Sequence, residues 1–304
     1  MQIPLSMIMA AGQPPPVPNQ TRAAALVPQA QPQSQDPITQ EYFDRLNNDY
    51  TKLREEYAAL KDSGGGKILN TDIARELSPH YLSDRTKSAN VHEPSSQFIK
   101  QVYADKLSNP TPKGMDNTVV FTAGGTGAGK TTALEAVKNI SESVKRAEMV
   151  YDTNMNKFET SDKKIQQALR ANRKVSIIYT YRDPVEALEN GALKRATRQE
   201  KEFGTGRTVP IGEHLKTHLG SRQVIEQLQK KYAKNPRVNI QIVDNSLGRG
   251  NARASQLDKL PKLEENEVKR RLYETLERVR SSGIGGTERI SDAIYRGTKG
   301  ANAR

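Results

Sequence analysis

Cysteine and tryptophan are absent from this 304-residue chain, and aromatic residues make up only 5% of it. Without cysteine, the chain has no disulfides, no thiolate metal sites and no cysteine nucleophile, although its redox compartment stays open. The scarcity of aromatic rings argues against base stacking as the main means of binding a nucleic acid. No apolar run reaches the roughly 18 residues of a membrane span, so no transmembrane segment is expected.

Hydrophobic residues are also few, at 35%, so part of the chain is expected to stay unpacked. The N-terminal segment lacks the basic stretch of a signal peptide, which favours a cytoplasmic protein. Export without a cleaved signal, as an effector delivered to another cell, stays open. What the chain has in excess is positive charge, a formal +12. This charge fits an anionic partner such as a nucleotide, a nucleic acid, an anionic membrane or an acidic protein. It fits a solvated basic surface equally well.

Composition divides the chain into four parts. Residues 1–36 are rich in proline and glutamine and are predicted to be disordered. Residues 37–63 carry apolar side chains three and four apart, which predicts one amphipathic helix. This helix would either cover an active site or pack on the neighbouring domain. Residues 64–247 are predicted to form the catalytic domain, and residues 248–304 a helical, basic extension with a basic tail.

Short apolar segments alternate with helical patterns in the central part. The segments predict strands at 67–72, 118–123, 147–152, 174–181 and 239–245, the last of these being the final strand. Helices are predicted at 93–107, from the end of the second strand to about 140, and at 161–172, 184–203, 211–233 and 264–280. This alternation predicts an α/β fold with three layers and a mainly parallel central sheet, and the glycine-rich motif described next assigns it to the P-loop nucleotide-binding kind.

The segment TVVFTAGGTGAGKTTAL, residues 118–134, satisfies the pattern G-x-x-x-x-G-K-[ST] between a strand and a helix. Glycines let the backbone curl until successive N–H groups point at phosphate oxygens. Lys130 is expected to reach the β and γ phosphates, and the Thr131 hydroxyl to bind Mg²⁺. The predicted nucleotide-binding residues are Gly124, Gly125, Thr126, Gly127, Ala128, Gly129, Lys130, Thr131 and Thr132. The loop alone does not separate ATP from GTP, or a kinase from a hydrolase.

A kinase also needs a carboxylate that orients and deprotonates the acceptor hydroxyl. Asp152 ends the third predicted strand and is a candidate for this base, or for a Mg²⁺ ligand. Asp72 stands where a predicted strand meets a helix, and by itself it fits the role of a helix N-cap better. His214 and His218 have a spacing that can bind a metal, but no third ligand is evident, so surface or packing roles are favoured.

The string D-x-x-R-x-x-x-P-x-Y, formed by Asp72, Arg75, Pro79 and Tyr81, resembles the element that carries the catalytic aspartate in zeta toxin kinases. Residues 150–184 are similar to the strand, helix and strand that follow the acceptor site in this family. Residues 193–219 resemble its arginine-bearing lid. The resemblance spans about 67–247. In the family the aspartate element follows the phosphate loop, whereas here it precedes it, so the order looks circularly permuted.

The resemblance implies a role for several residues. Asp72 would be the general base, and Arg207 and Arg195, with Arg198 as the fallback, would neutralise the transferring phosphate together with Lys130. The residues implied in binding the acceptor are Asp152, Gln101, Asn154 and Arg75.

The implied activity is transfer of the γ-phosphate of ATP, with Mg²⁺, to a sugar hydroxyl of UDP-N-acetylglucosamine. Such a toxin would need an inhibitor protein, an antitoxin, in the cell that makes it. A dinucleotide acceptor such as NAD is a related expectation. A kinase or ATPase acting on nucleic acid, and a nucleotide-binding interaction module without catalysis, are the alternatives.

Overall fold

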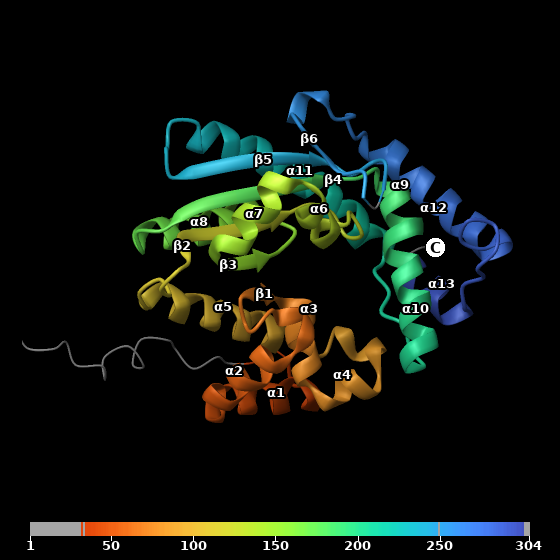
Figure 1. The fold of residues 1–304 in the computed structure, drawn as a ribbon. Helices are drawn as coiled ribbons and strands as arrows, with labels where there is room; N and C mark the ends of the chain where they lie inside the picture. The colour runs from red at the N-terminus through yellow and green to blue at the C-terminus, as the bar shows by residue number, and fades with distance from the viewer. Residues whose placement is uncertain (1–31, 33, 249, 301–304) are drawn as a thin grey trace, which may run out of the picture.

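A six-stranded sheet runs through the centre of the protein (Figure 1), in the computed structural model that describes residues 32, 34–248 and 250–300. The strand order is β1-β3-β2-β4-β5-β6, with β1 (Ile68–Asn70), β3 (Ala147–Asp152), β2 (Asp116–Ala123), β4 (Lys174–Tyr181), β5 (Val238–Asp244) and β6 (Arg253–Ser255). The first five strands are parallel, and β6 pairs antiparallel with β5. The predicted α/β fold with a mainly parallel sheet is confirmed.

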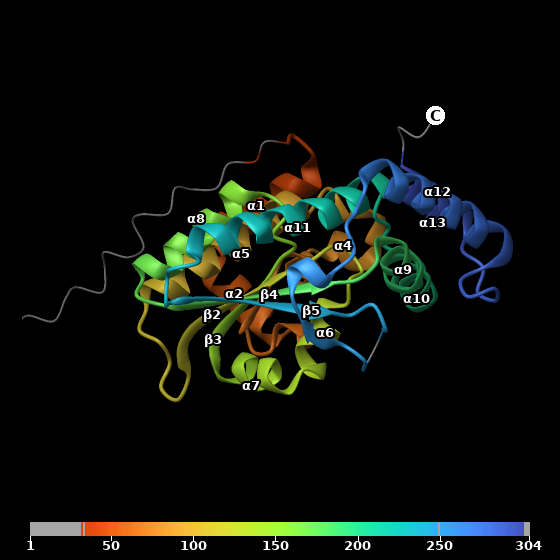
Figure 2. The same ribbon diagram turned by 90° about the horizontal axis from the view of Figure 1, so that it is seen from above.

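Helices cover both faces of this sheet (Figure 2). One face carries α5 (His92–Ser108), α8 (Phe158–Arg170) and α11 (Ile211–Tyr232), and the other carries α6 (Lys130–Ala136) and α7 (Lys138–Arg146). The remaining α-helices of the described part are α1 (Pro37–Asn48), α2 (Tyr50–Ala59), α3 (Thr71–Ala74), α4 (Pro79–Ser83), α9 (Pro184–Ala187), α10 (Lys194–Phe203), α12 (Glu265–Ser282) and α13 (Asp292–Lys299). No helix of the described part is long and apolar enough to cross a membrane.

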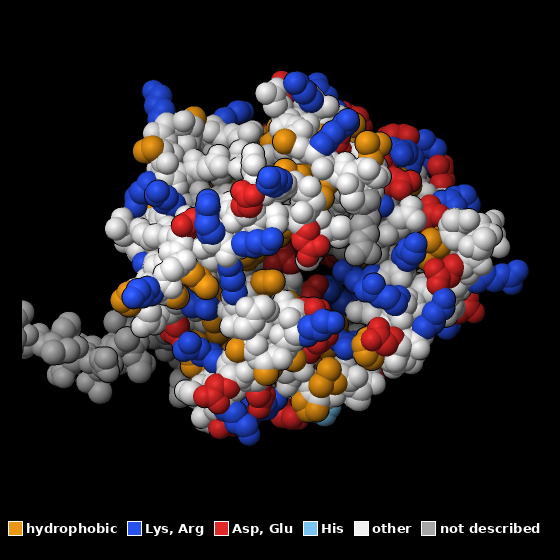
Figure 3. Space-filling model, viewed as in Figure 1, with side chains coloured by type: hydrophobic (Ala, Val, Ile, Leu, Met, Phe, Trp, Pro, Cys, Tyr) orange, Lys and Arg blue, Asp and Glu red, His pale blue; other side chains and the backbone are white. Residues whose placement is uncertain are grey.

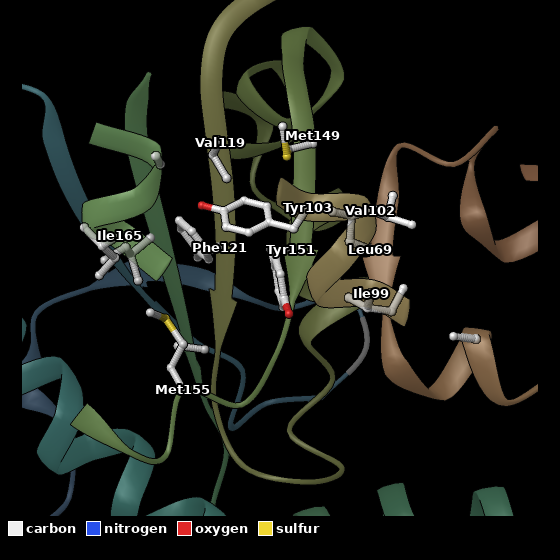
Figure 4. Packing of buried hydrophobic residues seen from close by; sticks show 14 of the residues in the cluster. Leu69, Ile99, Val102, Tyr103, Val119, Phe121, Met149, Tyr151, Met155 and Ile165 are labelled. Atoms are coloured by element: carbon white, nitrogen blue, oxygen red, sulfur yellow. The ribbon is translucent and has the colours of Figure 1, made fainter. Parts of the chain in front are cut away.

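Alternate residues of the buried strands pack on opposite faces of the sheet, as the strand period requires. Val119 and Phe121 of β2 join the core under α5 and α8, whereas Val120 between them packs under α6 and α7. The rings of Tyr103, Phe121 and Tyr151 meet on the first face (Figure 4), with the centroids of Tyr103 and Tyr151 5.1 Å apart. This core fixes the strand ends from which the site side chains project.

The N-terminal helical segment differs from its prediction. Residues 37–63 were expected to form one helix, but the structure has α1 and α2, with a break at Asp49. The break falls in the sequence Asn-Asn-Asp, whose side chains compete with the helix for backbone hydrogen bonds. Both helices belong to the main core rather than standing apart as a cover. Most of the predicted disordered segment, 1–36, lies outside the described residues.

Four other expectations need correction. The helix after the phosphate loop was predicted to run to about residue 140, but it breaks at Val137 into α6 and α7. The predicted helix 184–203 contains a π-helical turn, Leu188–Leu193, between α9 and α10. The strand at 239–245 is not the last one, because β6 follows it. Finally, the predicted basic tail begins within a helix, because residues 295–299 belong to α13, in which Ile294, Tyr295 and Thr298 are spaced to bury one face.

Candidate active site

The phosphate loop leaves the carboxyl end of β2, at the middle of the sheet, and leads into α6. Its backbone turns through the left-handed region at Gly127 and Gly129, with φ of 75° and 79°. Within the described residues, the backbone N–H groups of Gly125, Gly127 and Gly129 donate no hydrogen bond. A curled run of free N–H groups is the arrangement that binds the oxygens of a phosphate, so the loop fits a nucleotide.

Residues that lie far from the phosphate loop in the sequence contact its backbone and fix its conformation. Thr126 N–H donates to Thr217 Oγ1 over 3.1 Å, and Asn245 Nδ2 donates to the carbonyl of Ala128 over 2.8 Å. His218 Nε2 lies 3.0 Å from the carbonyl of Thr126. A Cβ on Gly125 would lie 2.2 Å from the imidazole of His218, so only glycine fits there.

Of the surface and packing roles that the sequence left open for His214 and His218, the structure shows packing, because both are buried, and their rings lie 4.6 Å apart. Burial lowers the pKa of His214 to about 4, and burial together with the neighbouring His214 holds the pKa of His218 well below its usual value. Both imidazoles are therefore neutral at physiological pH. No group of three or more metal-ligating side chains is found in the part of the chain that the structure covers.

Lys130 points from the start of α6 toward the end of β3. Its Nζ donates to Asn154 Oδ1 over 2.7 Å. Burial lowers the pKa of Lys130, and the carboxylates of Asp152 and Asp72 act in the opposite direction. Both carboxylates thus lie within electrostatic reach of the loop lysine. Thr131 is exposed at the start of α6, where its hydroxyl is free to meet a cation, and Thr132 is half-buried.

Asp152 ends β3 between two neighbouring strands that both contact it. Thr122 Oγ1 of β2 donates to Asp152 Oδ1, and Asn70 Nδ2 of β1 donates to Asp152 Oδ2, each over 2.5 Å. The parallel register sets Asn70 directly beside Asp152. These contacts fix the orientation of the carboxylate at the carboxyl edge of the sheet. Neither Thr122 nor Asn70 was singled out from the sequence, although each is a polar residue near the end of a strand.

Asp72 sits in the first turn of α3, but it is not the N-cap that the sequence alone favoured. Asn70 is the cap, because its Oδ1 accepts from the backbone N–H groups of Asp72 and Ile73. The Asp72 side chain, 44% exposed, forms an ion pair with Arg207 Nη1 and lies 3.4 Å from Arg75 Nη1. Asp72 is thereby free of a capping role and points at the lid.

Three cations surround this carboxylate. Burial by itself would raise the pKa of Asp72, but Arg207, Arg75 and Arg195 outweigh it and hold that pKa well below its usual range. Arg75 is buried and tied down, since it donates to Ser88 Oγ over 2.6 Å and to His92 Nδ1 over 2.7 Å. Asp72 is therefore ionised, and Arg75 fixes its surroundings.

The two arginines of α10 differ in their surroundings. Arg195 faces the site: its Nη2 is buried and has no hydrogen-bond partner among the described residues. Burial lowers the pKa of Arg195, as does Arg207, while Asp72 raises it. Arg198 is exposed on the solvent side of the same helix. A guanidinium with a buried nitrogen that lacks a partner fits an anion, so Arg195 is a better candidate for the site than Arg198.

Asp72, Lys130, Arg195 and Arg207 lie within electrostatic reach of one another. Acidic and basic side chains gather at a hollow between α3 and α10 in the space-filling view (Figure 3). Gln101 is half-buried on α5, and no hydrogen bond joins its side chain to these groups within the described ranges. Arg182, which the sequence analysis did not name, reaches the loop, with Nη1 3.5 Å from the carbonyl of Gly127.

Comparison with known proteins gives a match to the part of the chain that follows the phosphate loop. Residues 142–256 match the family model of the zeta toxin. The matched stretch runs from α7 to β6 and contains Asp152, Asn154 and the lid arginines. It covers less than half of the chain, and the phosphate loop and Asp72 precede it. No curated protein matches the chain. The similarity to zeta toxin supports a P-loop kinase with a kinase-like phosphotransferase activity.

Proposed function

We propose that this zeta toxin-like protein is an ATP-dependent kinase that phosphorylates a sugar hydroxyl of a nucleotide-containing acceptor, UDP-N-acetylglucosamine or a similar compound. The observation that carries the proposal is the pairing across one cleft of the phosphate loop with the Asp72–Arg207 ion pair. A loop that binds phosphates needs an opposing carboxylate and mobile cations before it can move a phosphoryl group to an alcohol.

The donor side is formed by the phosphate loop. The free N–H groups of Gly125, Gly127 and Gly129, with the Lys130 ammonium, would hold the phosphates of ATP. When Mg²⁺ is bound, it would neutralise negative charge on those phosphates, and the Thr131 hydroxyl is the group of this chain that would hold it. The guanidinium of Arg195, which has no partner of its own, would bind the transferring phosphoryl group with Arg207.

The acceptor side lies between α3 and the end of β3. Asp72 would accept the proton of the attacking hydroxyl, whose oxygen forms a bond to the γ-phosphorus. The bond from that phosphorus to the β–γ bridging oxygen breaks, and ADP leaves with the bridging electrons. Asp152 and Asn154, fixed by Thr122, Asn70 and Lys130, would orient the acceptor, with Arg75 and Gln101 as further contacts.

We also propose that the chain is circularly permuted relative to the zeta toxin order. In support, β1 comes from upstream of the phosphate loop yet lies in the sheet as the outer neighbour of β3. A strand at this edge could be supplied from either side of the loop without changing the sheet, because only the connections differ. A cytoplasmic toxin or a delivered effector, with a protein inhibitor where it is made, completes the proposal.

The test is phosphorylation of a panel of nucleotide sugars, dinucleotides and oligonucleotides with Mg-ATP, read by mass spectrometry, in the wild type and in Asp72→Asn. We expect a nucleotide sugar to gain one phosphate, and Asp72→Asn to lower kcat by about 10²- to 10⁴-fold. ATP should bind Asp72→Asn at least as tightly, because the change removes a negative charge beside Arg207 and Arg195.

Asp44→Asn is the matched control. Asp44 is exposed on α1 and makes no hydrogen bond or ion pair among the described residues, so the variant makes the same change in net charge without touching the site. Full transfer by Asp72→Asn would refute the assigned base. Transfer to NAD or to an oligonucleotide end would replace the acceptor class. ATP binding without transfer to any acceptor would favour an interaction module.

A further inference from the structure

A third hydrophobic core joins the lid, taken from here on as residues 183–208, to the C-terminal helices. It is separate from the cores on the two faces of the sheet. Its buried members are Leu188, Ala192, Leu193 and Ala196 of the lid, Ile211 and Leu215 of α11, and Val268, Leu272, Leu276, Val279, Ile284, Ile294 and Tyr295 of the C-terminal segment. The apolar side of the lid is thus covered by residues 265–300 rather than by the sheet.

Polar contacts along the lid reinforce this cover. Glu189, in the π-helical turn, accepts from both Arg278 Nη atoms and from Gly285 N–H, the latter over 3.1 Å. Three further pairs tie the lid to the same segment: Asp183 with Arg271 at 3.6 Å, Glu200 with Ser291 at 2.6 Å, and Lys201 with Glu288 at 2.5 Å. The contacts occur from one end of the lid to the other, so the lid and the C-terminal helices form one packed unit.

The tightest approach lies next to Arg207. A Cβ on Gly297 of α13 would lie 2.3 Å from Thr208 Oγ1, 3.0 Å from its Cβ and 3.1 Å from its Cγ2. Rotation of the threonine side chain can move Oγ1 and Cγ2 but not Cβ, so a tight contact at 3.0 Å would remain. Beyond the same helix, a Cβ on Gly300 would lie 3.3 Å from Pro210, the N-cap of α11. The turn that presents Arg207 therefore rests directly on α13.

Asp72 lies on the opposite side of the lid. Figure 1 shows α10 between α13 on one side and the α3–α4 segment on the other. Arg195 and Arg207 reach from the lid toward Asp72, whereas the apolar and acidic lid residues face α12 and α13. A shift of the C-terminal helices would thus be transmitted through the packed lid to the two arginine side chains.

We propose that α12 and α13 are a built-in brace that sets the position of Arg195 and Arg207 for phosphoryl transfer, with Gly297 as the positioning residue closest to Arg207. This rests on the proposed kinase function. If Thr208 keeps its rotamer, relief of the 2.3 Å overlap to ordinary contact requires a displacement of about 1 Å between α13 and the turn. A misplacement of this size at a catalytic group lowers the rate by up to about 100-fold.

Gly297→Ala tests the brace, with Gly212→Ala as the matched control. Both glycines lie in helices, but a Cβ on Gly212 would meet nothing within 4 Å. We expect Gly297→Ala to lower kcat by about 10- to 100-fold with little change in the KM for ATP, and Gly212→Ala to keep wild-type kinetics. Adding Thr208→Ala to Gly297→Ala removes Oγ1 and Cγ2 and should restore part of the rate.

Hydrogen exchange of residues 194–208 gives a readout that does not depend on activity. The lid should exchange faster in Gly297→Ala than in wild type or Gly212→Ala. Ser291→Ala is a milder second variant, because it removes the hydrogen bond to Glu200 and the N-cap of α13, and a two- to tenfold loss of kcat is expected. Unchanged kcat and unchanged lid exchange in both variants would overturn the brace. A wild type that phosphorylates no acceptor would instead refute the proposed function, and the exchange comparison would still decide the brace.

Discussion

The environment of Arg195 leads to a prediction in which activity and stability change in opposite directions. Its side chain is half-buried, its Nη2 is buried without a hydrogen-bond partner among the described residues, and Arg207 and Arg75 are like-charged neighbours. Burial and these cations make the charged form unfavourable in the folded protein, and Asp72 is the main group that opposes them. Such a group is costly to keep unless it meets an anion in the reaction.

Arg195→Met removes the guanidinium and keeps an unbranched side chain of similar helix propensity. An arginine that stabilises a transferring phosphoryl group is worth about 10³- to 10⁵-fold in kcat. Because Arg207 shares the role here, we expect the lower end, a loss of about 10³-fold, which corresponds to about 4 kcal/mol of transition-state stabilisation. The thermal midpoint should not fall, since the change removes a desolvated cation without opening the core.

Arg198→Met is the matched control, one helical turn away on the same helix and exposed. Its kcat should stay within about twofold of wild type and its stability within about 0.5 kcal/mol. Single-turnover transfer from Mg-ATP to the accepted acceptor, together with thermal unfolding, measures both quantities. An equal loss of rate in the two variants would refute the assignment. The assignment would also be refuted if the loss of kcat in Arg195→Met were no larger than its loss of folded protein.

Two further predictions concern stability. The pKa of His214 is lowered to about 4 and that of His218 lies well below 6.5, so the unfolded chain takes up protons that the folded chain does not as pH falls from 6.5 toward 4. The free energy of unfolding should therefore fall by about 1.4 kcal/mol per pH unit for each histidine. Denaturant titration at several pH values measures this fall. An imidazolium NMR signal from either ring in the folded protein at pH 6 would contradict it. Tyr57 OH donates to the carbonyl of Ile68 and accepts from Asn70 N–H, so Tyr57→Phe should lower the free energy of unfolding by about 1–3 kcal/mol. Tyr273→Phe, at a half-buried tyrosine without a hydrogen bond among the described residues, should cost less than about 0.5 kcal/mol, and equal costs would contradict the role of Tyr57.

The central strands and the phosphate loop could be predicted because their signals are local. Strands buried on both faces need continuous apolar runs, and β2, β3, β4 and β5 all have them. The strand β6 has no such signal. Residues 253–255 are Arg-Ala-Ser, and they form a strand because β5 offers an open edge and Asp244 a partner for Arg253. Pairing of this kind depends on the folded sheet and leaves no pattern in the segment itself.

The candidate site was less predictable than the sheet, because its residues meet only through long-range packing. Arg195 and Arg198 lie three positions apart, so they point about 60° from one another around the helix, and the sequence does not reveal which one faces inward. The orientation is decided by Leu193 and Ala196, which pack against the C-terminal helices. The contact of Asn245 with the loop carbonyl of Ala128 likewise requires β5 and β2 to be placed in one sheet.

The two ends of the described chain support opposite walls of the cleft. Tyr42 OH and Arg45 Nη1 of α1 each donate over 2.6 Å to backbone carbonyls of the Asp72 element, those of Ala74 and Leu77. The lid rests in turn on α12 and α13. Each wall is thus held from outside, and the walls meet at the ion pair of Asp72 with Arg207.

In this ion pair the pKa of Asp72 is too low for efficient uptake of a proton. Phosphoryl transfer has a loose transition state in which the hydroxyl loses its proton late, so a carboxylate that first orients the hydroxyl is sufficient. A γ-phosphate that draws Arg207 and Arg195 toward itself would raise the basicity of Asp72 at the same step, which links donor binding to activation of the acceptor.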